Sequence, residues 1–305
     1  MRSRPARMRD SFNSLSVMPQ SPVHSAPILL LRGRSLVLDR PLVMGVLNVT
    51  PDSFSDGGRY LDPGAAVTHA LEMAEDGADV IDIGAESSRP GSEPVSEAEE
   101  LRRLIPVVRE ICRRVAVPVS VDTTKAAVAA AAIEAGASMV NDISAGQADP
   151  EMMRMVAETG AGFVLMHMQG TPQTMQRAPR YGSVVDDVRD FLGSRMQAAG
   201  QAGIAADQIL LDPGIGFGKN LDHNLILLDR LDAFHSLGRP ILVGVSRKAF
   251  IGEVLGRRTG DRLMGTAAAV AAAVLRGAKV VRVHDVKVMQ DVVRMIHAIQ
   301  TGTTR

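Results

Sequence analysis

Arg282 and His284 are the two residues of this sequence that indicate chemistry most directly. They lie two positions apart in Val281-Arg282-Val283-His284, so in a β-strand both project from one face while the valines project from the other. An arginine beside a histidine suits an anion, and a guanidinium can bind phosphate through two parallel hydrogen bonds. The structural alternative is an ion pair between Arg282 and Asp285. We favour the anion site.

Polar residues also follow seven other apolar runs of the chain. Any one of them could be a helix N-cap, a position that Asp, Asn and Ser commonly occupy. Because every run ends in a hydrogen-bonding or charged group, we predict that together they surround a polar ligand. The residues are Asn48, Glu86-Ser87-Ser88-Arg89, Asp122, Asn141-Asp142, His167, Asp212 and Ser246-Arg247-Lys248. His167, between two methionines, fits a buried wall residue and a catalytic group equally well.

The run Asp212–Lys219 is rich in glycine but does not match a phosphate-binding P-loop. Pro213 replaces the first required glycine, and Asn220 replaces the Ser or Thr. We predict instead that its glycines let the backbone approach a flat ligand closely. Asp212 would then accept hydrogen bonds from paired N–H donors of that ligand.

Two segments, Asn48–Tyr60 and Gly84–Ser96, are longer than the about 2–6 residues usual between a strand and a helix. Both are rich in Gly, Ser and Pro, and both contain hydroxyl groups and arginine. Loops of this length at the mouth of a barrel are typical lids or substrate-binding loops.

Strands and helices that could position these residues alternate along the chain. Continuous apolar runs are typical of strands buried on both faces, and Ala-, Leu- and Glu-rich helical segments lie between them. The predicted strands are 42–47, 79–83, 117–121, 138–140, 162–166, 208–211, 241–245 and 279–283; helical candidates include 64–76, 96–114, 125–135, 183–201, 262–276 and 286–299. Eight such units predict an α/β fold, a (β/α)8 TIM barrel with its chemistry at the carboxyl ends of the strands. A doubly wound open sheet is the alternative, but the glycine-rich turn expected after its first strand is absent.

The region before the first unit predicts a β-hairpin. Ile28–Arg32 and Leu36–Leu38 flank Gly33-Arg34-Ser35, and the hairpin would close the bottom of the barrel. No linker divides residues 27–300, so we predict one domain there. Residues 1–26 are rich in Arg, Ser and Pro and lack an apolar segment, which predicts a disordered extension and not a secretory signal.

Composition limits the classes of function. The chain has 34 basic and 34 acidic residues, and this balance argues against a nucleic-acid-binding protein. No apolar stretch approaches the ~18 residues that span a bilayer, so we expect no membrane partner and a cytoplasmic location. Cys112 is the single cysteine; it cannot form an internal disulfide, and we predict an inert packing residue.

Eight motifs of this chain resemble those of the dihydropteroate synthase family. They are Met44–Gly58, Glu86–Gly91, Val121-Asp122-Thr123, Val140-Asn141-Asp142-Ile143, Leu165–Gly170, Leu211–Lys219, Gly244–Lys248 and Arg282–Asp285. The resemblance covers roughly residues 28–298 in the family's order. It implies a transferase that joins 6-hydroxymethyl-7,8-dihydropterin diphosphate to p-aminobenzoate, giving 7,8-dihydropteroate and diphosphate. It also implies a homodimer, for which the Ala-rich segment Ala267–Leu275 is a candidate contact surface.

The resemblance further implies roles for individual residues. The pterin site would consist of Asp122, Asn141, Asp212 and Lys248, with Met166 and Phe217 as apolar walls and Arg282 stacked on the ring. The diphosphate site would consist of Asn48, Arg282 and His284, and Asn48 would help to hold Mg2+. The p-aminobenzoate pocket would consist of Asp52, Phe54, Ser87, Ser88, Arg89, Pro90, Ser246 and Lys248. Ser88 stands where the family usually has Thr, and we expect modest changes in packing from this difference.

Two other functions are weighed against this one. A pterin-binding methyltransferase domain would share the Asp and Asn pocket but needs neither the long Ser- and Arg-containing loops nor the Arg-x-His pair. A non-catalytic pterin-binding paralogue would not need to retain the full set of side chains, which is present here apart from the Ser88 difference. Both features favour the synthase.

Overall fold

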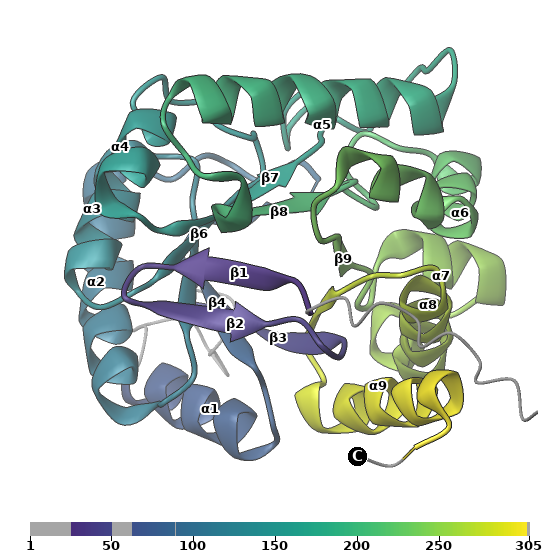
Figure 1. Cartoon of the computed structure of the whole chain (residues 1–305), viewed down its shortest axis with the longest axis horizontal. Helices are drawn as coiled ribbons and strands as arrows, with labels where there is room; N and C mark the ends of the chain where they lie inside the picture. The colour runs from purple at the N-terminus through teal and green to yellow at the C-terminus, as the bar shows by residue number, and fades with distance from the viewer. Residues whose placement is uncertain (1–25, 51–62, 89, 304–305) are drawn as a thin grey trace, which may run out of the picture.

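The computed structural model shows a ring of helices around a barrel of parallel strands (Figure 1). It describes residues 26–50, 63–88 and 90–303. The strands are β1 Ile28–Leu31, β2 Arg34–Val37, β3 Leu42–Asn48, β4 Val80–Gly84, β5 Val119–Asp122, β6 Met139–Asp142, β7 Gly162–Met166, β8 Ile209–Asp212, β9 Leu242–Gly244 and β10 Val280–Val283. The α-helices are α1 Pro63–Glu75, α2 Glu97–Arg114, α3 Ala126–Glu134, α4 Met152–Thr159, α5 Val184–Gln201, α6 Leu221–Asp229, α7 Ala249–Leu255, α8 Leu263–Leu275 and α9 Val286–Thr301.

Eight of the strands, β3 to β10, form one parallel sheet that curves into a barrel. The order is β8-β7-β6-β5-β4-β3-β10-β9, and every neighbouring pair is parallel. The two edges meet through a parallel bridge between Leu211 and Ile241, where the Leu211 N–H donates to the Pro240 carbonyl at 3.0 Å. The predicted (β/α)8 barrel is therefore confirmed, and the open-sheet alternative is wrong.

The strands alternate between two apolar environments. One set of side chains, including Ile81, Val121 and Val281, packs outward in the large cluster with the helices. A second set lies in a separate inner cluster: Leu42, Met44, Val80, Met139, Val164, Leu210, Leu242 and Val280. Since side chains alternate along a strand, the next inward positions are two residues further along. These positions hold Asp82, Asn141, Asp212 and Arg282, so the barrel interior changes from apolar to polar towards the carboxyl ends of its strands.

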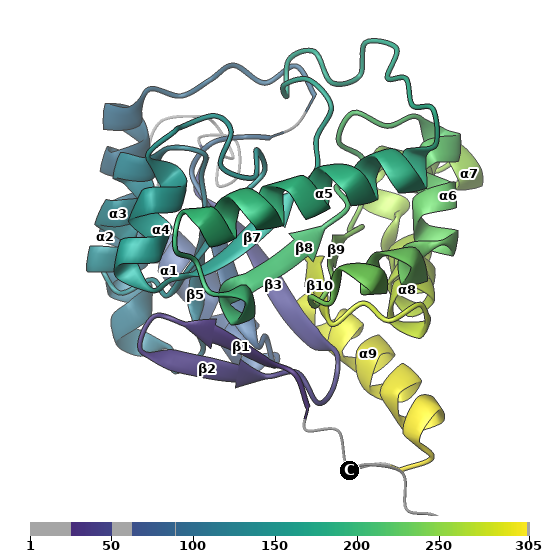
Figure 2. The same cartoon turned by 45° about the horizontal axis from the view of Figure 1, so that its top comes forward.

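The hairpin β1–β2 closes the amino-terminal end of the barrel, as predicted (Figure 2). Leu29, Leu31 and Leu38 belong to the inner apolar cluster, so the hairpin supplies the floor of the barrel. The Arg32 N–H donates to the Ser138 carbonyl at 3.2 Å and fixes the turn to the end of the sheet. The turn lies at Arg32 and Gly33 and not at the predicted Gly33-Arg34-Ser35, because Arg34 and Ser35 are already paired with Leu31 and Leu30. Gly33 has φ +70°, a conformation that glycine adopts without strain.

None of the helices within the described ranges is both long and apolar enough to cross a membrane. Cys112 is partly buried in α2, and burial raises the pKa of its thiol to about 11. It is therefore protonated at neutral pH, in agreement with the packing role predicted for it.

Candidate active site

A cluster of four largely buried polar side chains lies at the centre of the barrel mouth. Arg282 donates from Nε to Asp82 Oδ2 at 2.6 Å and from a terminal nitrogen to Asp122 Oδ2 at 2.7 Å. Asn141 Nδ2 donates to the same Asp82 oxygen at 2.9 Å. Asp82 is completely buried, and its other oxygen, Oδ1, has no hydrogen-bond partner among the described residues. One arginine thus links three strands, β4, β5 and β10.

Arg282 does not form the ion pair with Asp285 that was the alternative to an anion site. Asp285 instead accepts from Arg247, at 3.0 Å from Nε and 2.5 Å from a terminal nitrogen. Arg282 points inward to its two carboxylates, and two of its five N–H donors are used in these bonds. The remaining donors can bind an anionic group at the mouth.

Asp122 has a perturbed pKa. Burial raises it most, the Arg282 guanidinium lowers it, and the neighbouring Asp82 carboxylate raises it again, giving a pKa of about 7. An aspartate that titrates near neutral pH within a cleft is typical of a functional site. Asp122 and Asn141 were both predicted as ligand-binding residues, and the structure brings them together around Arg282.

A second group of predicted site residues lies where the loops after β8 and β9 meet. The Gly214 N–H donates to Asp212 Oδ1 at 2.7 Å, and burial raises the pKa of Asp212. Lys248 donates to the Ile215 carbonyl, and its Nζ lies 4.5 Å from the centre of the Phe217 ring. Burial lowers the pKa of Lys248 to about 8, against the opposing effect of Asp212. The lysine, the carboxylate and the aromatic ring are therefore neighbours, as the prediction of a flat-ligand site requires.

The glycines of the loop after β8 allow a close backbone approach, but to the loop after β7; the predicted approach to a flat ligand stays a prediction. Gly214 has φ +69°, and a Cβ there would lie 1.9 Å from the His167 carbonyl oxygen. Gly218 has φ +62°, and a Cβ there would lie 2.5 Å from the Gln169 carbonyl oxygen. The loop after β8 thus packs directly on the backbone of the loop after β7, and a side chain at either position would separate them.

His167 is a wall residue. Its Nδ1 lies 2.9 Å from Lys219 Nζ, and its ring lies edge-on to Phe191 with centroids 4.8 Å apart. Burial and the nearby Lys219 charge lower its pKa to about 3, so it is neutral at pH 7. Lys219 is only 2% exposed, and burial lowers its pKa to about 7. Its ammonium also donates to the Phe217 carbonyl at 2.9 Å, which holds the glycine-rich loop.

His284 and Ser246 lie together at the ends of β10 and β9. The His284 N–H donates to Ser246 Oγ at 3.2 Å, and His284 Nδ1 lies 3.0 Å from the same oxygen. Asn48 ends the neighbouring strand β3 and is paired in register with Gly84. The three predicted residues thus lie at the carboxyl ends of consecutive strands in the order β9, β10, β3.

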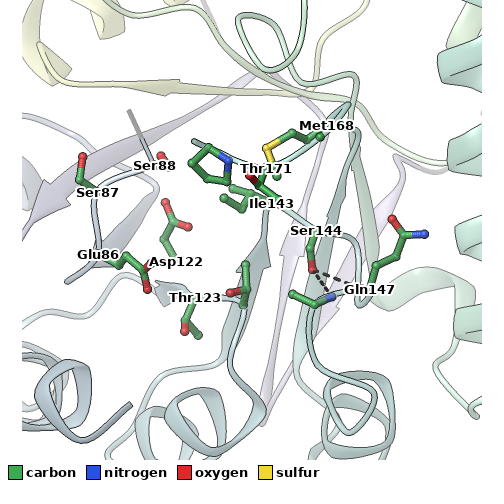
Figure 3. A pocket seen from close by; sticks show the side chains of 14 residues that line it. Glu86, Ser87, Ser88, Asp122, Thr123, Ile143, Ser144, Gln147, Met168 and Thr171 are labelled. Atoms are coloured by element: carbon green, nitrogen blue, oxygen red, sulfur yellow. Dashed lines mark hydrogen bonds between the residues drawn. The ribbon is translucent and has the colours of Figure 1, made fainter. Parts of the chain in front are cut away.

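A pocket of about 300 Å³ opens beside the central cluster (Figure 3). Figure 3 shows Glu86, Ser87 and Ser88 on one side and Ser144 and Gln147 on the other, with Asp122 and Thr123 between them. Its remaining lining residues are Thr124, Ile143, Ala148, Met168, Gly170, Thr171 and Pro172. The pocket joins the predicted loop residues Ser87 and Ser88 to the predicted ring-binding residue Asp122.

The structure places the other predicted residues as follows. Met166 is buried at the end of β7, Phe217 is half-buried, and Pro90 is exposed on the loop after β4. Asp52, Phe54 and Arg89 lie outside the described residues. Asp82 and Lys219 were not predicted as site residues. Asp82 stands inside an apolar run, where a single charge could have revealed it, whereas Lys219 was considered only as part of a P-loop.

Comparison with known proteins agrees with this geometry. Residues 44–284 match the family described as pterin binding enzyme. The dihydropteroate synthase of Escherichia coli (strain K12) is 48% identical over 270 residues, covering 88% of this chain and 95% of that protein. The Yersinia pestis dihydropteroate synthase, solved with a sulfonamide drug complex, has a TM-score of 0.86 and 45% identity, covering 90% of this chain and 99% of that one.

A second solved structure is similar to the same extent. The Xanthomonas albilineans dihydropteroate synthase with 4-aminobenzoic acid has a TM-score of 0.85 and 47% identity, covering 90% of this chain and 98% of that chain. This chain belongs to the dihydropteroate synthase family of pterin-binding enzymes.

Proposed function

We propose that this protein condenses 6-hydroxymethyl-7,8-dihydropterin diphosphate with p-aminobenzoate to form 7,8-dihydropteroate and diphosphate. The observation that carries the proposal is Arg282, held between Asp82 and Asp122 at the centre of the barrel mouth. This arrangement puts a fixed positive charge directly beside the carboxylate that would bind the pterin. The relatives named above are dihydropteroate synthases, and one was solved with 4-aminobenzoic acid.

The pterin would bind between the two groups of polar residues. Asp122 and Asp212 offer carboxylate oxygens to its N–H donors. Asn141 donates a hydrogen bond from Nδ2 to Asp82, which leaves its Oδ1 to accept a hydrogen bond from the ligand. Lys248 beside Asp212 would donate to a ring oxygen or nitrogen, while Met166 and Phe217 would cover the apolar faces and Arg282 would stack on the ring. Such a site combines apolar walls with a few well-placed polar groups.

The chemical difficulty is the departure of diphosphate from the pterin methylene carbon. Arg282, His284 and Asn48 would stabilise the charge that develops on the leaving oxygen, and preorganised charges of this kind are usually the largest contribution to catalysis. The carbon–oxygen bond breaks, the neutral aromatic amine forms the carbon–nitrogen bond with the electron-poor methylene, and the amine then loses a proton to solvent. No general base is required for the attack, because an aniline nitrogen is not protonated at pH 7.

The donor set at the end of β3 fits Mg2+. The Asn48 amide offers one hard oxygen ligand, and Mg2+ commonly binds one or two protein oxygens together with substrate phosphates and water. No group of three or more His, Cys, Asp or Glu side chains that could hold a metal occurs in the described part of the chain, so most ligands would come from the diphosphate and water. When bound there, Mg2+ would neutralise negative charge on the leaving diphosphate.

The amine would bind on the outer side of the pterin. Ser87 and Ser88 line the pocket next to Asp122, and Ser246 and Lys248 lie on the loop after β9. Asp52, Phe54, Arg89 and Pro90 would complete this pocket, and closure of the two long loops would keep water from capturing the methylene cation. The Arg-x-His pair and these loops favour a synthase over a pterin-binding methyltransferase domain.

We also propose a homodimer located in the cytoplasm. Ala267–Leu275 was predicted as the contact surface, and it lies in α8. Met264, at the start of this helix, is 78% exposed, and Leu275, at its end, is 54% exposed. Large apolar side chains exposed on neighbouring elements are characteristic of an interaction surface.

The proposed reaction is tested with the purified protein, the pterin diphosphate, p-aminobenzoate and Mg2+. We expect diphosphate release that depends on the amine and formation of dihydropteroate in equal amount. Release without amine dependence, or no release at all, would contradict the synthase. A protein that binds the pterin diphosphate without turnover would be the non-catalytic paralogue.

A further inference from the structure

We propose that Lys125 is a positioning residue for the amine substrate, acting through an ion triad with Glu86 and Glu100. This triad fixes the root of the loop that carries Ser87 and Ser88. The inference deepens the proposed function and rests on it, because it assigns a device for holding the p-aminobenzoate side of the same site.

The triad joins three separate elements. Lys125 Nζ donates to Glu100 Oε2 at 2.6 Å and also to Glu86 Oε2. Glu86 begins the loop after β4, Glu100 lies in the first turn of α2, and Lys125 is the N-cap residue of α3. The Lys125 side chain is 23% exposed, Glu86 is 29% exposed and Glu100 is completely buried.

The burial of Glu100 indicates that the triad holds Lys125 in a fixed position. Its neighbour Glu99 pairs with Arg102 and Arg103 on the helix surface, where a charge needs little compensation. Glu100 instead points inward, and its Oε1 has no hydrogen-bond partner among the described residues. A buried carboxylate is unfavourable unless it is paired, so Lys125 is held firmly by Glu100. The same ammonium then fixes Glu86.

The position of Glu86 connects this anchor to the site. Glu86 directly precedes Ser87 and Ser88, and all three line the pocket next to Asp122 (Figure 3). Two further bonds hold the loop: Ser92 Oγ donates to the Ser87 carbonyl at 2.5 Å, and the Gly91 N–H donates to the Pro172 carbonyl at 3.0 Å. The first of these bonds holds the backbone of Ser87, whereas among the described residues only the triad attaches the Glu86 side chain to the neighbouring helices by charge. Loss of that contact would therefore displace the serine hydroxyls relative to Asp122.

The test uses Glu86→Ala and Lys125→Met, with Lys125→Arg as the conservative variant. For both Glu86→Ala and Lys125→Met we expect the KM for p-aminobenzoate to rise roughly tenfold, in the range expected when a positioning contact is lost. The dissociation constant of the pterin should change less than about twofold, because Asp122, Asn141 and Asp212 keep their own contacts. Lys125→Arg should restore most of the lost affinity for the amine. The double variant Glu86→Ala/Lys125→Met should have a KM for p-aminobenzoate no higher than that of the more impaired single variant, since both changes break the same contact.

Glu99→Ala is the matched control, because it removes a glutamate from the same helical turn that has no contact with the loop. It should leave both constants unchanged. Lys125→Met leaves Glu100 buried without a partner; if that variant does not fold, Glu86→Ala, which keeps the Lys125–Glu100 pair, decides the question. An unchanged amine KM in folded Glu86→Ala, or an equal loss of amine and pterin binding, would overturn the positioning role. Absence of amine-dependent turnover in the wild-type protein would instead remove the proposed function itself.

Discussion

Arg282 determines how charge is distributed in the barrel mouth. It is balanced by the buried Asp82 and the partly exposed Asp122 before any substrate binds, so its position does not depend on the anion. Asp82 anchors this arrangement, since one of its oxygens accepts from both Arg282 and Asn141. A preorganised cation of this kind requires no rearrangement when charge develops on a leaving group. The pKa of Asp122 and the behaviour of Asp82 variants are the direct tests of this arrangement.

The raised pKa of Asp122 predicts that pterin affinity depends on pH. With a pKa of about 7, Asp122 is largely protonated at pH 5.5 and becomes an acceptor as the pH rises. Affinity for a pterin without diphosphate should therefore increase about tenfold between pH 5.5 and pH 7. The pKa is raised above the unfolded value, so this group's contribution to folding stability is present at acid pH and is lost as the pH rises through about 7. Calorimetric titration at several pH values measures the affinity, and Asp122→Asn should bind weakly without this slope.

Asp82→Asn should alter both catalysis and the pH dependence. The change removes the charge that anchors Arg282, and a hydrogen bond to a charged group contributes about 1.5–3 kcal/mol, so kcat should fall by roughly tenfold to a hundredfold. Asp82 also raises the pKa of Asp122, so the midpoint of pterin binding should move to lower pH in the variant. Asp229→Asn, which breaks an exposed pair with Arg276, is the control and should change neither quantity. A variant with reduced kcat and an unchanged midpoint would contradict the coupling of Asp82 to Asp122.

Individual site residues differed in how far the sequence revealed them. Asp122, Asn141 and Asp212 were predictable because they follow apolar strands, and the strand ends of a barrel meet at one mouth. The two partners of Arg282 were not predictable. Asp82 and Asp122 lie 200 and 160 residues away from it in sequence, and only the closed barrel brings them near it. His167 was left between two roles, and the buried contact with Lys219 decides for the wall.

Among the loops of the site, the loop after β8 is the one least tolerant of added volume. Gly214→Ala would place a Cβ 1.9 Å from the His167 carbonyl oxygen at a positive φ. We expect a loss of stability of at least about 1–3 kcal/mol from overpacking, together with loss of pterin binding because the loops after β7 and β8 must separate. Denaturant unfolding and pterin titration measure the two effects.

Gly200→Ala is the control for this prediction. Gly200 lies inside α5 with no atom within 4 Å of a Cβ, and it does not have a positive φ. Alanine there should stabilise the protein by about 0.5–1 kcal/mol and leave pterin binding unchanged. If Gly214→Ala were as stable as wild type, the close packing of the two loops would not hold in solution.

The order of the strands and helices was predictable, and their boundaries differ from the prediction by two residues or fewer at most ends. Strand 162–166 was predicted with its observed ends, whereas 117–121 begins at Val119 because Pro118 has no N–H to donate to the sheet. Helices α4, α6 and α7 were not specified among the predicted helices. They have only seven to nine residues, so their helical period is hard to distinguish in sequence. Helix α3 is equally short, but its run of alanines made it recognisable.

Along the barrel axis, the residues that stabilise the fold and the residues of the site lie at opposite ends. The hairpin and the inner apolar cluster close one end, and Asp82, Asn141, Asp212 and Arg282 occupy the other. Each barrel contains all the site residues described here, so a second copy is not needed to complete the mouth. A dimer would therefore use the outer helices and should be separable from activity.

Met264→Glu tests whether α8 forms the dimer contact. Met264 is the most exposed of the large apolar residues in the described structure, at 78%, and α8 packs beside α6 and α7, which expose Leu225, Ile226, Val254 and Leu255. A charge on such a surface is unfavourable when buried in an interface, so light scattering should show a wild-type dimer and a monomeric variant. The variant should retain kcat, since the site lies inside each barrel. Val37→Glu, at an apolar position of the hairpin that is 50% exposed, should leave the dimer intact; a wild-type monomer, or dissociation by both variants alike, would exclude α8 as the contact surface.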